Sequence, residues 1–158
     1  MRATELLRQD HEHVHQLFLQ LEQSAGSEER QRLLDQIADE IEVHAKVEEE
    51  LFYPALAPVS RRVEDARAGH QHVRSLIGEV QGRDTGSEGF MPAVQRLKQA
   101  VLIHVAEEEG AMFLEAGRLG PGELESLGAK IADRQQALKT SLLQRGVRAI
   151  KKAAQKVA

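Results

Sequence analysis

The fold follows from the stretch His104-Val105-Ala106-Glu107-Glu108, inside a segment that is predicted to be helical over residues 87–117. Apolar residues precede it at the spacing of a buried helical face: Val94, Leu97 and Val101. Continued further, the same spacing reaches His104, Glu108 and Ala111, so a histidine and a carboxylate stand where a helix bundle places apolar side chains. Because a buried polar group costs free energy unless it finds a partner, these two side chains need partners inside the core.

The same pattern occurs sixty residues earlier in the chain. There the spaced positions are Leu34, Ile37, Ile41, His44, Glu48 and Leu51. The segments before the two stretches also match, because each contains His-x-His-Val, at residues 11–14 and 70–73. The chain therefore reads as two helix pairs in tandem, each with His-x-His-Val on its first helix and His-x-x-x-Glu-Glu on its second.

Helical periodicity covers the rest of the chain, and no segment alternates apolar and polar residues as a half-buried strand does. The predicted helices are residues 3–24, 27–53, 60–81, 87–117 and 123–156. Pro54 is expected to bend or end the second helix. Because the connections are short, the sequence predicts an all-α fold: an antiparallel up-down four-helix bundle with an additional C-terminal helix. We expect residues 1–118 to form the bundle and residues 119–158 a basic helical extension.

Composition limits the classes of function. The 158 residues are 41% hydrophobic and 29% charged, as in an ordinary globular domain. Cysteine is absent, which excludes disulfides, thiolate metal ligands and cysteine nucleophiles. No segment approaches the ~20 apolar residues of a membrane helix, and the first residues lack the apolar centre of a signal peptide. We therefore expect a cytoplasmic location.

Charge is distributed unevenly along the chain. All 25 acidic residues lie at or before Asp133. The basic residues that follow are Arg134, Lys139, Arg145, Arg148, Lys151, Lys152 and Lys156. This basic C-terminal helix has three candidate partners: the acidic bundle of its own chain, nucleic acid, or an acidic surface such as a membrane. Docking on its own bundle is the favoured interpretation.

Four histidines and two glutamates are the candidate metal ligands. Residues four apart lie on one face of a helix, so each His-x-x-x-Glu pair can contact one ion or two adjacent ions. The first helix of each pair adds a histidine from its apolar stripe, which is His70 in the second pair and, by alignment of the repeat, His11 in the first. The predicted ligands are His11, His44, Glu48, His70, His104 and Glu108.

Six protein ligands suit a pair of ions, because each carboxylate can bridge. Nitrogen and oxygen donors without sulfur fit iron first, with manganese or zinc less favoured. His15, one turn beyond His11, is a candidate at the rim of the site, and together with Tyr53 and Arg74 it is a candidate additional ligand or a residue that contacts the ligands. Tyr53 either hydrogen-bonds near the site or packs with its ring, and packing is favoured. His13 and His72 are expected at the surface, and the sequence assigns no catalytic residue.

Together these motifs resemble those of the hemerythrin-like (HHE cation-binding) domain family. The matching residues lie between about residues 5 and 116: Asp10-His11, His44-x-x-x-Glu48-Glu49-Glu50 leading into Leu51-Phe52-Tyr53-Pro54, His70, and His104-x-x-x-Glu108-Glu109-Gly110. The resemblance implies a non-haem di-iron centre, with or without an oxo or hydroxo bridge, held by the six predicted ligands. It also implies O₂ or another small diatomic molecule or peroxide as the bound partner.

One position departs from the pattern of the oxygen-carrying hemerythrins. Those proteins have a second histidine one turn after the first on the third helix, where this chain has Arg74. The change leaves an open coordination position or calls in another ligand, such as His15, a water molecule or a nearby carboxylate. Reversible oxygen storage is therefore less firmly predicted than di-iron binding.

The sequence leaves three interpretations open. The first is a hemerythrin-like non-haem di-iron protein that binds O₂ or a related small oxidant, as an oxygen or iron sensor or store. The second is a di-iron enzyme that handles peroxide or nitric oxide. The third is a metal-free helical interaction module with a basic tail, whose histidines would make the core sensitive to pH. The first is preferred, so a metal-binding or sensing protein is expected rather than a dedicated enzyme.

Overall fold

The computed structural model describes residues 1–157, which contain helices and turns but no strand. In chain order the elements are α1 (Ala3–Gln23), α2 (Ser27–Val47), the π-helical turn η1 (Glu48–Phe52), α3 (Tyr53–Leu56), α4 (Val63–Gln81), α5 (Phe90–Glu107), the π-helical turn η2 (Glu108–Met112), α6 (Phe113–Ala116), the 3-10 turn η3 (Gly117–Leu119) and α7 (Pro121–Val157). The prediction of an all-α bundle with a further C-terminal helix is confirmed. Over the described range, no helix is both long enough and apolar enough to cross a membrane.

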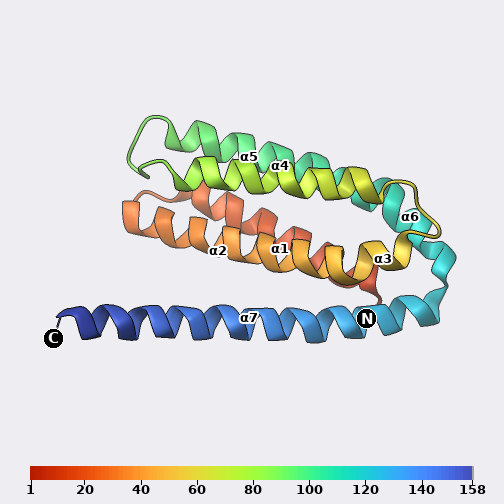
Figure 1. The fold of residues 1–158 in the computed structure, drawn as a ribbon. Helices are drawn as coiled ribbons and strands as arrows, with labels where there is room; N and C mark the ends of the chain where they lie inside the picture. The colour runs from red at the N-terminus through yellow and green to blue at the C-terminus, as the bar shows by residue number, and fades with distance from the viewer. Residues whose placement is uncertain (158) are drawn as a thin grey trace.

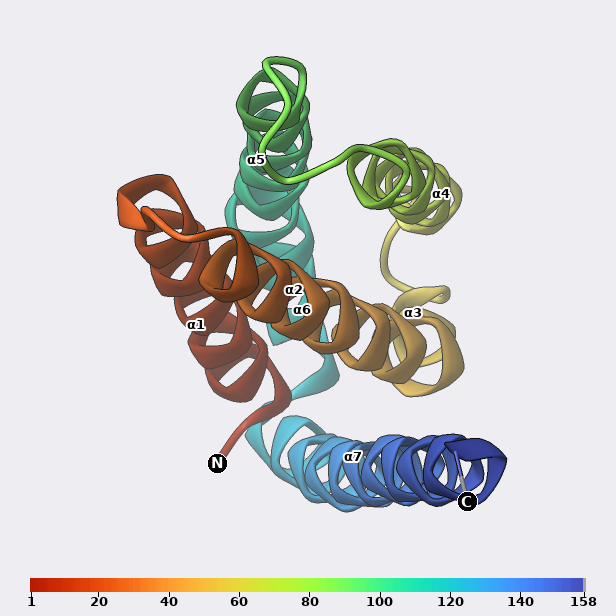
Figure 2. The ribbon, with the colours of Figure 1, turned by 90° about the vertical axis from the view of Figure 1, so that its left-hand side faces the viewer.

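The helices form three layers (Figure 1). α1 and α2 make an antiparallel pair in the middle, α4 and α5 make a second pair on one side, and α7 runs along the other side. Seen along the bundle, α7 lies below α1 and α2 and away from α4 and α5 (Figure 2). The bundle is therefore built from two helical hairpins, and α7 covers only the first of them.

The apolar core is divided into two clusters with a polar layer between them. Leu7 and Phe52 belong to the cluster near α3 and α6, whereas Phe18 and Leu97 belong to the cluster nearer the α1–α2 loop. Each fully buried side chain of this size stabilises the fold by about 1.5–3 kcal/mol. Along α1, His11 lies between Leu7 and Phe18, so the histidine is held at mid-bundle by apolar packing on both sides.

The two π-helical turns shift the face that each helix presents to the core. They begin at Glu48 and Glu108, and a π turn carries an extra residue, so every later position moves by one. The sequence spacing placed Leu51 and Ala111 in the core, which is wrong, because both are only half-buried. The residues that fill the core instead are Phe52, Tyr53, Met112 and Phe113.

Pro54 does not end the second helix, which continues as α3 to Leu56. The proline lies in the first turn of α3, directly after the π turn η1. A proline is tolerated at the start of a helix because no intrahelical hydrogen bond is required of its nitrogen there. The helix therefore continues two residues past the proline and ends at Leu56, so Pro54 itself does not end it.

The first part of the basic C-terminal helix lies on its own bundle. Leu138 is buried against α1 and α2. Arg134 donates two hydrogen bonds to Glu50, at 2.7 and 3.1 Å, and Lys139 Nζ lies 3.4 Å from Glu40. Surface ion pairs contribute up to about 1 kcal/mol each, so apolar burial supplies most of this attachment.

Candidate metal centre

The six side chains predicted as ligands meet in the middle of the bundle. They are His11 on α1, His44 on α2, Glu48 at the start of η1, His70 on α4, His104 on α5 and Glu108 at the start of η2. Five are buried, and the sixth, His44, exposes only 12% of its side chain. The tandem repeat therefore converges on one place in the fold.

Their donor atoms form two overlapping groups. The first is His11, His44, Glu48 and Glu108, and the second is Glu48, His70, His104 and Glu108. Within each group, one donor atom from every residue lies within 4.8 Å of all the others. Because both carboxylates belong to both groups, the arrangement can hold two neighbouring cations that share them.

Imidazole nitrogens face the carboxylates at ion-pair distances. The Nε2 atom of His44 lies 3.2 Å from Glu48 Oε1, and that of His70 lies 3.0 Å from Glu48 Oε2. The Nε2 atom of His104 lies 2.9 Å from Glu108 Oε1. These contacts place nitrogen donors directly against the buried negative charge of the two carboxylates.

These contacts shift the pKa values of both partners. Burial alone would lower the pKa of His44, but the charge of Glu48 and a hydrogen bond with Asp10 hold it well above 6.5. Burial alone would raise the pKa of Glu48, but His44 and His70 hold it well below 4.5. A metal ion binding here must therefore displace protons from imidazoles that retain them strongly.

Several polar atoms at the centre have no well-aligned hydrogen bond within residues 1–157. They include Glu48 Oε1, Glu108 Oε2 and His104 Nε2, all of which are buried. Leaving such an atom unsatisfied costs about 1–3 kcal/mol. Divalent cations at the two donor groups would satisfy all three atoms, and the absence of sulfur donors suits iron, manganese or zinc. The residues present therefore fit a pair of metal ions.

The histidines of α1 and α2 are each supported from behind by a carboxylate. His11 donates from Nδ1 to Glu109 Oε1 at 2.8 Å, and His44 donates from Nδ1 to Asp10 Oδ2 at 3.2 Å. Asp10 in turn accepts a hydrogen bond from Gln135 of α7 at 2.5 Å. Contacts of this kind orient an imidazole and make it a better metal ligand.

The histidines of α4 and α5 are held differently. His70 Nδ1 lies 3.8 Å from Glu49 and has no hydrogen-bond partner in the described part of the chain. His104 Nδ1 packs against Gly69, where an added Cβ would lie only 2.7 Å away. Close packing therefore positions His104, and Gly69 provides the room that its ring requires.

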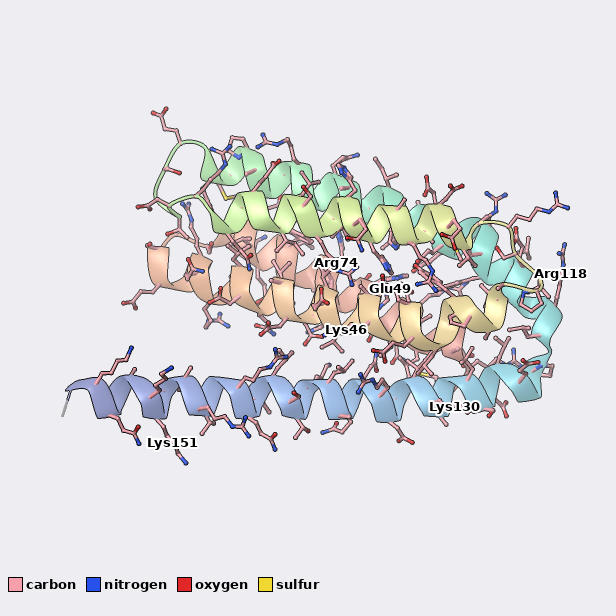
Figure 3. All side chains as sticks on the ribbon, viewed as in Figure 1. Lys46, Glu49, Arg74, Arg118, Lys130 and Lys151 are labelled. Carbon is pink, nitrogen blue, oxygen red and sulfur yellow. The ribbon has the colours of Figure 1, made fainter. Side chains whose placement is uncertain are left out.

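Arg74 holds Glu49 away from His70. Its guanidinium donates to Glu49 at 2.5 and 3.1 Å and to Glu42 at 3.1 Å, and Figure 3 shows Arg74 and Glu49 close together between α4 and α2. The Arg74 charge lowers the pKa of Glu49 even though burial raises it. A guanidinium has no lone pair to offer a metal, so Arg74 cannot replace the additional histidine of oxygen-carrying hemerythrins.

Of the two alternatives for Tyr53, the structure shows hydrogen bonding at the polar centre, although packing of its ring was the favoured one. Its hydroxyl lies 3.0 Å from His70 Nε2 and 3.1 Å from Glu48 Oε2, and it also contacts Glu108. Burial and the two carboxylates raise the pKa of Tyr53, so its hydroxyl stays protonated. The α-helical spacing missed this role, because a residue five positions after Glu48 reaches the same face only through the π turn.

A small cavity adjoins the centre. Its volume is about 30 Å³, and it is enclosed by the four ligand histidines together with Val14, Ile41, Val73 and Arg74 among others. This volume corresponds to about one water molecule. A diatomic molecule or one of similar size can therefore lie next to the imidazoles in mostly apolar surroundings.

His15 lies outside both donor groups. It lines a larger cavity of about 450 Å³ on the α1–α5 side, together with His11 and Glu109. Its Nδ1 is buried without a hydrogen-bond partner in the described residues. His13 and His72 are exposed. The structure thus places His15 at the rim, and the two histidines expected at the surface lie there.

Comparisons with known proteins also indicate a cation-binding domain. The family model for the hemerythrin HHE cation binding domain matches residues 2–116. A crystal structure of a hemerythrin HHE cation binding domain-containing protein from Mycobacterium kansasii, described as an Rv2633c homolog, superposes with a TM-score of 0.85 at 27% sequence identity, covering 92% of this chain and 91% of that chain.

Two curated relatives show different extents of similarity. The uncharacterized protein Rv2633c of Mycobacterium tuberculosis is 27% identical over 146 residues, covering 90% of this chain and 91% of that protein. A DNA nickase of Nostoc sp. is 26% identical over 115 residues, which is 72% of this chain. The chain spans only 33% of the length of the nickase.

Proposed function

The chain belongs to the hemerythrin HHE cation-binding domain family, and from that premise we propose that it holds two iron ions and binds O₂ or a related small oxidant beside them. The observation that supports this most strongly is the pair of overlapping donor groups, in which four histidines divide into two pairs around two shared carboxylates. Because each pair of histidines forms its own group with the same two carboxylates, the arrangement suits two neighbouring ions better than a single ion.

Each ligand has a distinct role in the proposed centre. His11 and His44 hold one ion, and His70 and His104 hold the other, with Glu48 and Glu108 shared between them. When bound, the iron pair supplies the redox chemistry, because each ion can give one electron to the oxidant. Manganese and zinc are the alternative metals that this donor set accepts.

The surrounding residues favour a small ligand. The cavity of about 30 Å³ beside the four histidines has room for a diatomic molecule or peroxide. Arg74 lines this cavity while its guanidinium is paired with Glu42 and Glu49, so the side chain contributes mainly its apolar part to the wall.

A second candidate function, the turnover of peroxide or nitric oxide, is favoured by one observation. Reduction of peroxide to water consumes protons, and the buried Tyr53 hydroxyl is a protonated group directly at the shared carboxylates. Under this alternative Tyr53 would donate a hydrogen bond to the peroxide, while the iron pair would supply the two electrons and water the two protons that its reduction consumes. Rapid loss of added peroxide by the iron-loaded protein, slowed in Tyr53→Phe, would favour the enzyme over the sensor or store.

The proposal is tested by purifying the chain under low oxygen and measuring its metal content and absorption spectrum. We expect about two iron ions per chain and an absorption change on adding O₂. His70→Ala should lose an ion, whereas His72→Ala, an exposed histidine on the same helix, is the matched control and should retain both. A protein that binds no metal at any pH, and in which His70→Ala behaves as His72→Ala does, would leave only the interaction module.

A further inference from the structure

The last part of α7 leaves the bundle. The last turns of the helix run past the start of α2, at the α1–α2 loop (Figure 1), and Leu142 is the last side chain of α7 that packs, half-buried, against the core. Every residue from 143 to 156 is exposed. These residues are called the C-terminal segment below.

The C-terminal segment is amphipathic. Its apolar residues recur at 4-3-4 spacing and form one stripe along the helix: Leu143, Val147, Ile150 and Ala154. The first three are 72%, 51% and 72% exposed. The other face carries the basic residues Arg145, Arg148, Lys151, Lys152 and Lys156, and the segment contains no acidic residue. Lys151 points away from the bundle (Figure 3).

The apolar stripe is turned away from the bundle. The side chains of α7 that pack against the bundle include Ile131, Leu138 and Leu142. Leu143 is one residue further and therefore about 100° around the helix from Leu142. The stripe consequently does not extend the apolar face that packs against the bundle, and no other described part of the chain covers it.

We propose that the C-terminal segment binds the surface of an anionic lipid bilayer. A helix of this kind lies in the plane of the interface, with its apolar stripe at the boundary between head groups and acyl chains. Its lysines and arginines meet the anionic head groups, and clusters of four to eight such residues on an amphipathic helix are typical of binding to acidic lipids. The metal centre is not involved, so this inference stands apart from the proposed function.

Two other occupants fit the segment less well. Nucleic acid would pair with the basic residues through its phosphates but would leave the apolar stripe in water. A second copy of the chain would bury the stripe but would bring two sets of five basic residues together, and like charges repel at close range. An anionic bilayer would bury the apolar stripe and pair the basic residues with its head groups at the same time.

The test is cosedimentation of the full metal-loaded chain with vesicles. One set contains phosphatidylcholine alone, and the other contains phosphatidylcholine with about a third phosphatidylglycerol. We expect binding to the anionic vesicles at least about tenfold stronger than to the neutral ones, weakening as salt is raised. The double variant Leu143→Ser/Ile150→Ser and the double variant Lys151→Gln/Lys152→Gln should each weaken binding by about tenfold or more.

Two matched controls distinguish the segment from the rest of the surface. Lys130→Gln removes a charge from the exposed side of the same helix (Figure 3), and Leu114→Ser removes a side chain that is 79% exposed on α6. Both should leave vesicle binding unchanged. Since every substituted side chain is exposed, helix content by circular dichroism and metal content should stay as in the parent chain, which shows that lost binding is not lost folding.

Three results would overturn the proposal. The first is equal binding to neutral and anionic vesicles, or none to either. The second is tight binding to duplex DNA that Leu143→Ser/Ile150→Ser leaves intact, which would assign the segment to nucleic acid. The third is self-association, measured by analytical ultracentrifugation, that this double variant abolishes while vesicle binding is absent. That result would assign the stripe to a second copy.

Discussion

The two helical hairpins carry the same motif but support it differently. In the α1–α2 pair, both histidines donate from Nδ1 to a carboxylate, His11 to Glu109 and His44 to Asp10. In the α4–α5 pair, the ring of His104 is positioned by packing against Gly69, and His70 Nδ1 has no hydrogen-bond partner in the described residues. A repeated sequence motif therefore does not produce two equivalent halves of the centre.

The difference predicts unequal ion binding. A carboxylate behind an imidazole fixes the ring and strengthens its donor atom, and removing such a partner commonly costs 10- to 100-fold in metal affinity. The α1–α2 half has two such partners and the α4–α5 half has none at hydrogen-bond distance. We therefore expect the first ion to bind to His11 and His44, with the second binding more weakly to His70 and His104.

The largest effect is expected from a carboxylate that both halves share. Glu108→Gln removes charge from both donor groups, so both ions should be lost and the melting temperature should fall by roughly 10 °C. Glu107→Gln is the matched control, because Glu107 is exposed and precedes Glu108 directly. Metal analysis and thermal melting measure the two quantities. Retention of both ions in Glu108→Gln would show that the Glu108 carboxylate is not a ligand shared by the two ions.

The next effect should separate the halves. In Gly69→Ala the new Cβ would lie 2.7 Å from His104 Nδ1, so the ring must move and the second ion should bind about 100-fold more weakly while the first is retained. Gly78→Ala is the control on the same helix, because a Cβ there meets no atom within 4 Å. It should stabilise the helix by about 0.5–1 kcal/mol. Equal metal affinities in the two variants would contradict the role given to Gly69.

A smaller effect should come from the outer carboxylates. Asp10→Ala removes the hydrogen bond to His44 Nδ1 and should lower the affinity for the first ion about tenfold. Glu49→Ala should change the affinity for the second ion by less than about threefold, because Glu49 lies 3.8 Å from His70 and is bound to Arg74. Isothermal titration with Fe²⁺ under low oxygen measures both. If Glu49→Ala lowered metal affinity more than Asp10→Ala did, the α4–α5 half would be the one that binds its ion more tightly, contrary to the prediction.

The smallest effect concerns pH. In the metal-free chain the raised pKa of His44 contributes stability that is full below pH 6.5 and is lost as the pH rises through its folded pKa. The lowered pKa of Glu48 contributes stability that is present above pH 4.5 and is lost as the pH falls through its folded pKa. The metal-free melting temperature should therefore decline on the alkaline side.

Metal reverses this dependence, because ions and protons compete for the same nitrogens. The difference in melting temperature between iron-loaded and metal-free chains should grow as the pH rises from about 6 to 8. Thermal melts in matched buffers give the comparison directly. A difference that shrinks over this range would show that the imidazoles do not bind the metal.

Much of the fold could be predicted because it rests on periodic patterns. The apolar spacing located the five long helices and placed His44, His70 and His104 on inward faces, and alignment of the tandem repeat added His11. Helical spacing failed after Glu48 and Glu108, where it chose Leu51 and Ala111 for the core. A π turn depends on tertiary packing, and no residue type marks it in a single sequence.

The residues that contact the ligands from outside were harder to predict, because they too depend on tertiary packing. Tyr53 reaches Glu48 and Glu108 only because η1 brings it round. Asp10, Glu49 and Glu109 each adjoin a predicted ligand in the chain, a signal that could have identified them. Whether such a neighbour supports a histidine depends on competing partners, and Arg74 shows this by drawing Glu49 away from His70.

The most direct test of the central claim is an anaerobic titration of the metal-free chain with Fe²⁺, followed by calorimetry. We expect about two ions per chain, bound in two steps whose affinities differ by about tenfold or more. The tighter step should be lost in His44→Ala. Binding of a single ion, or no binding by a chain that is otherwise folded, would contradict the claim that the two hairpins enclose a pair of metals.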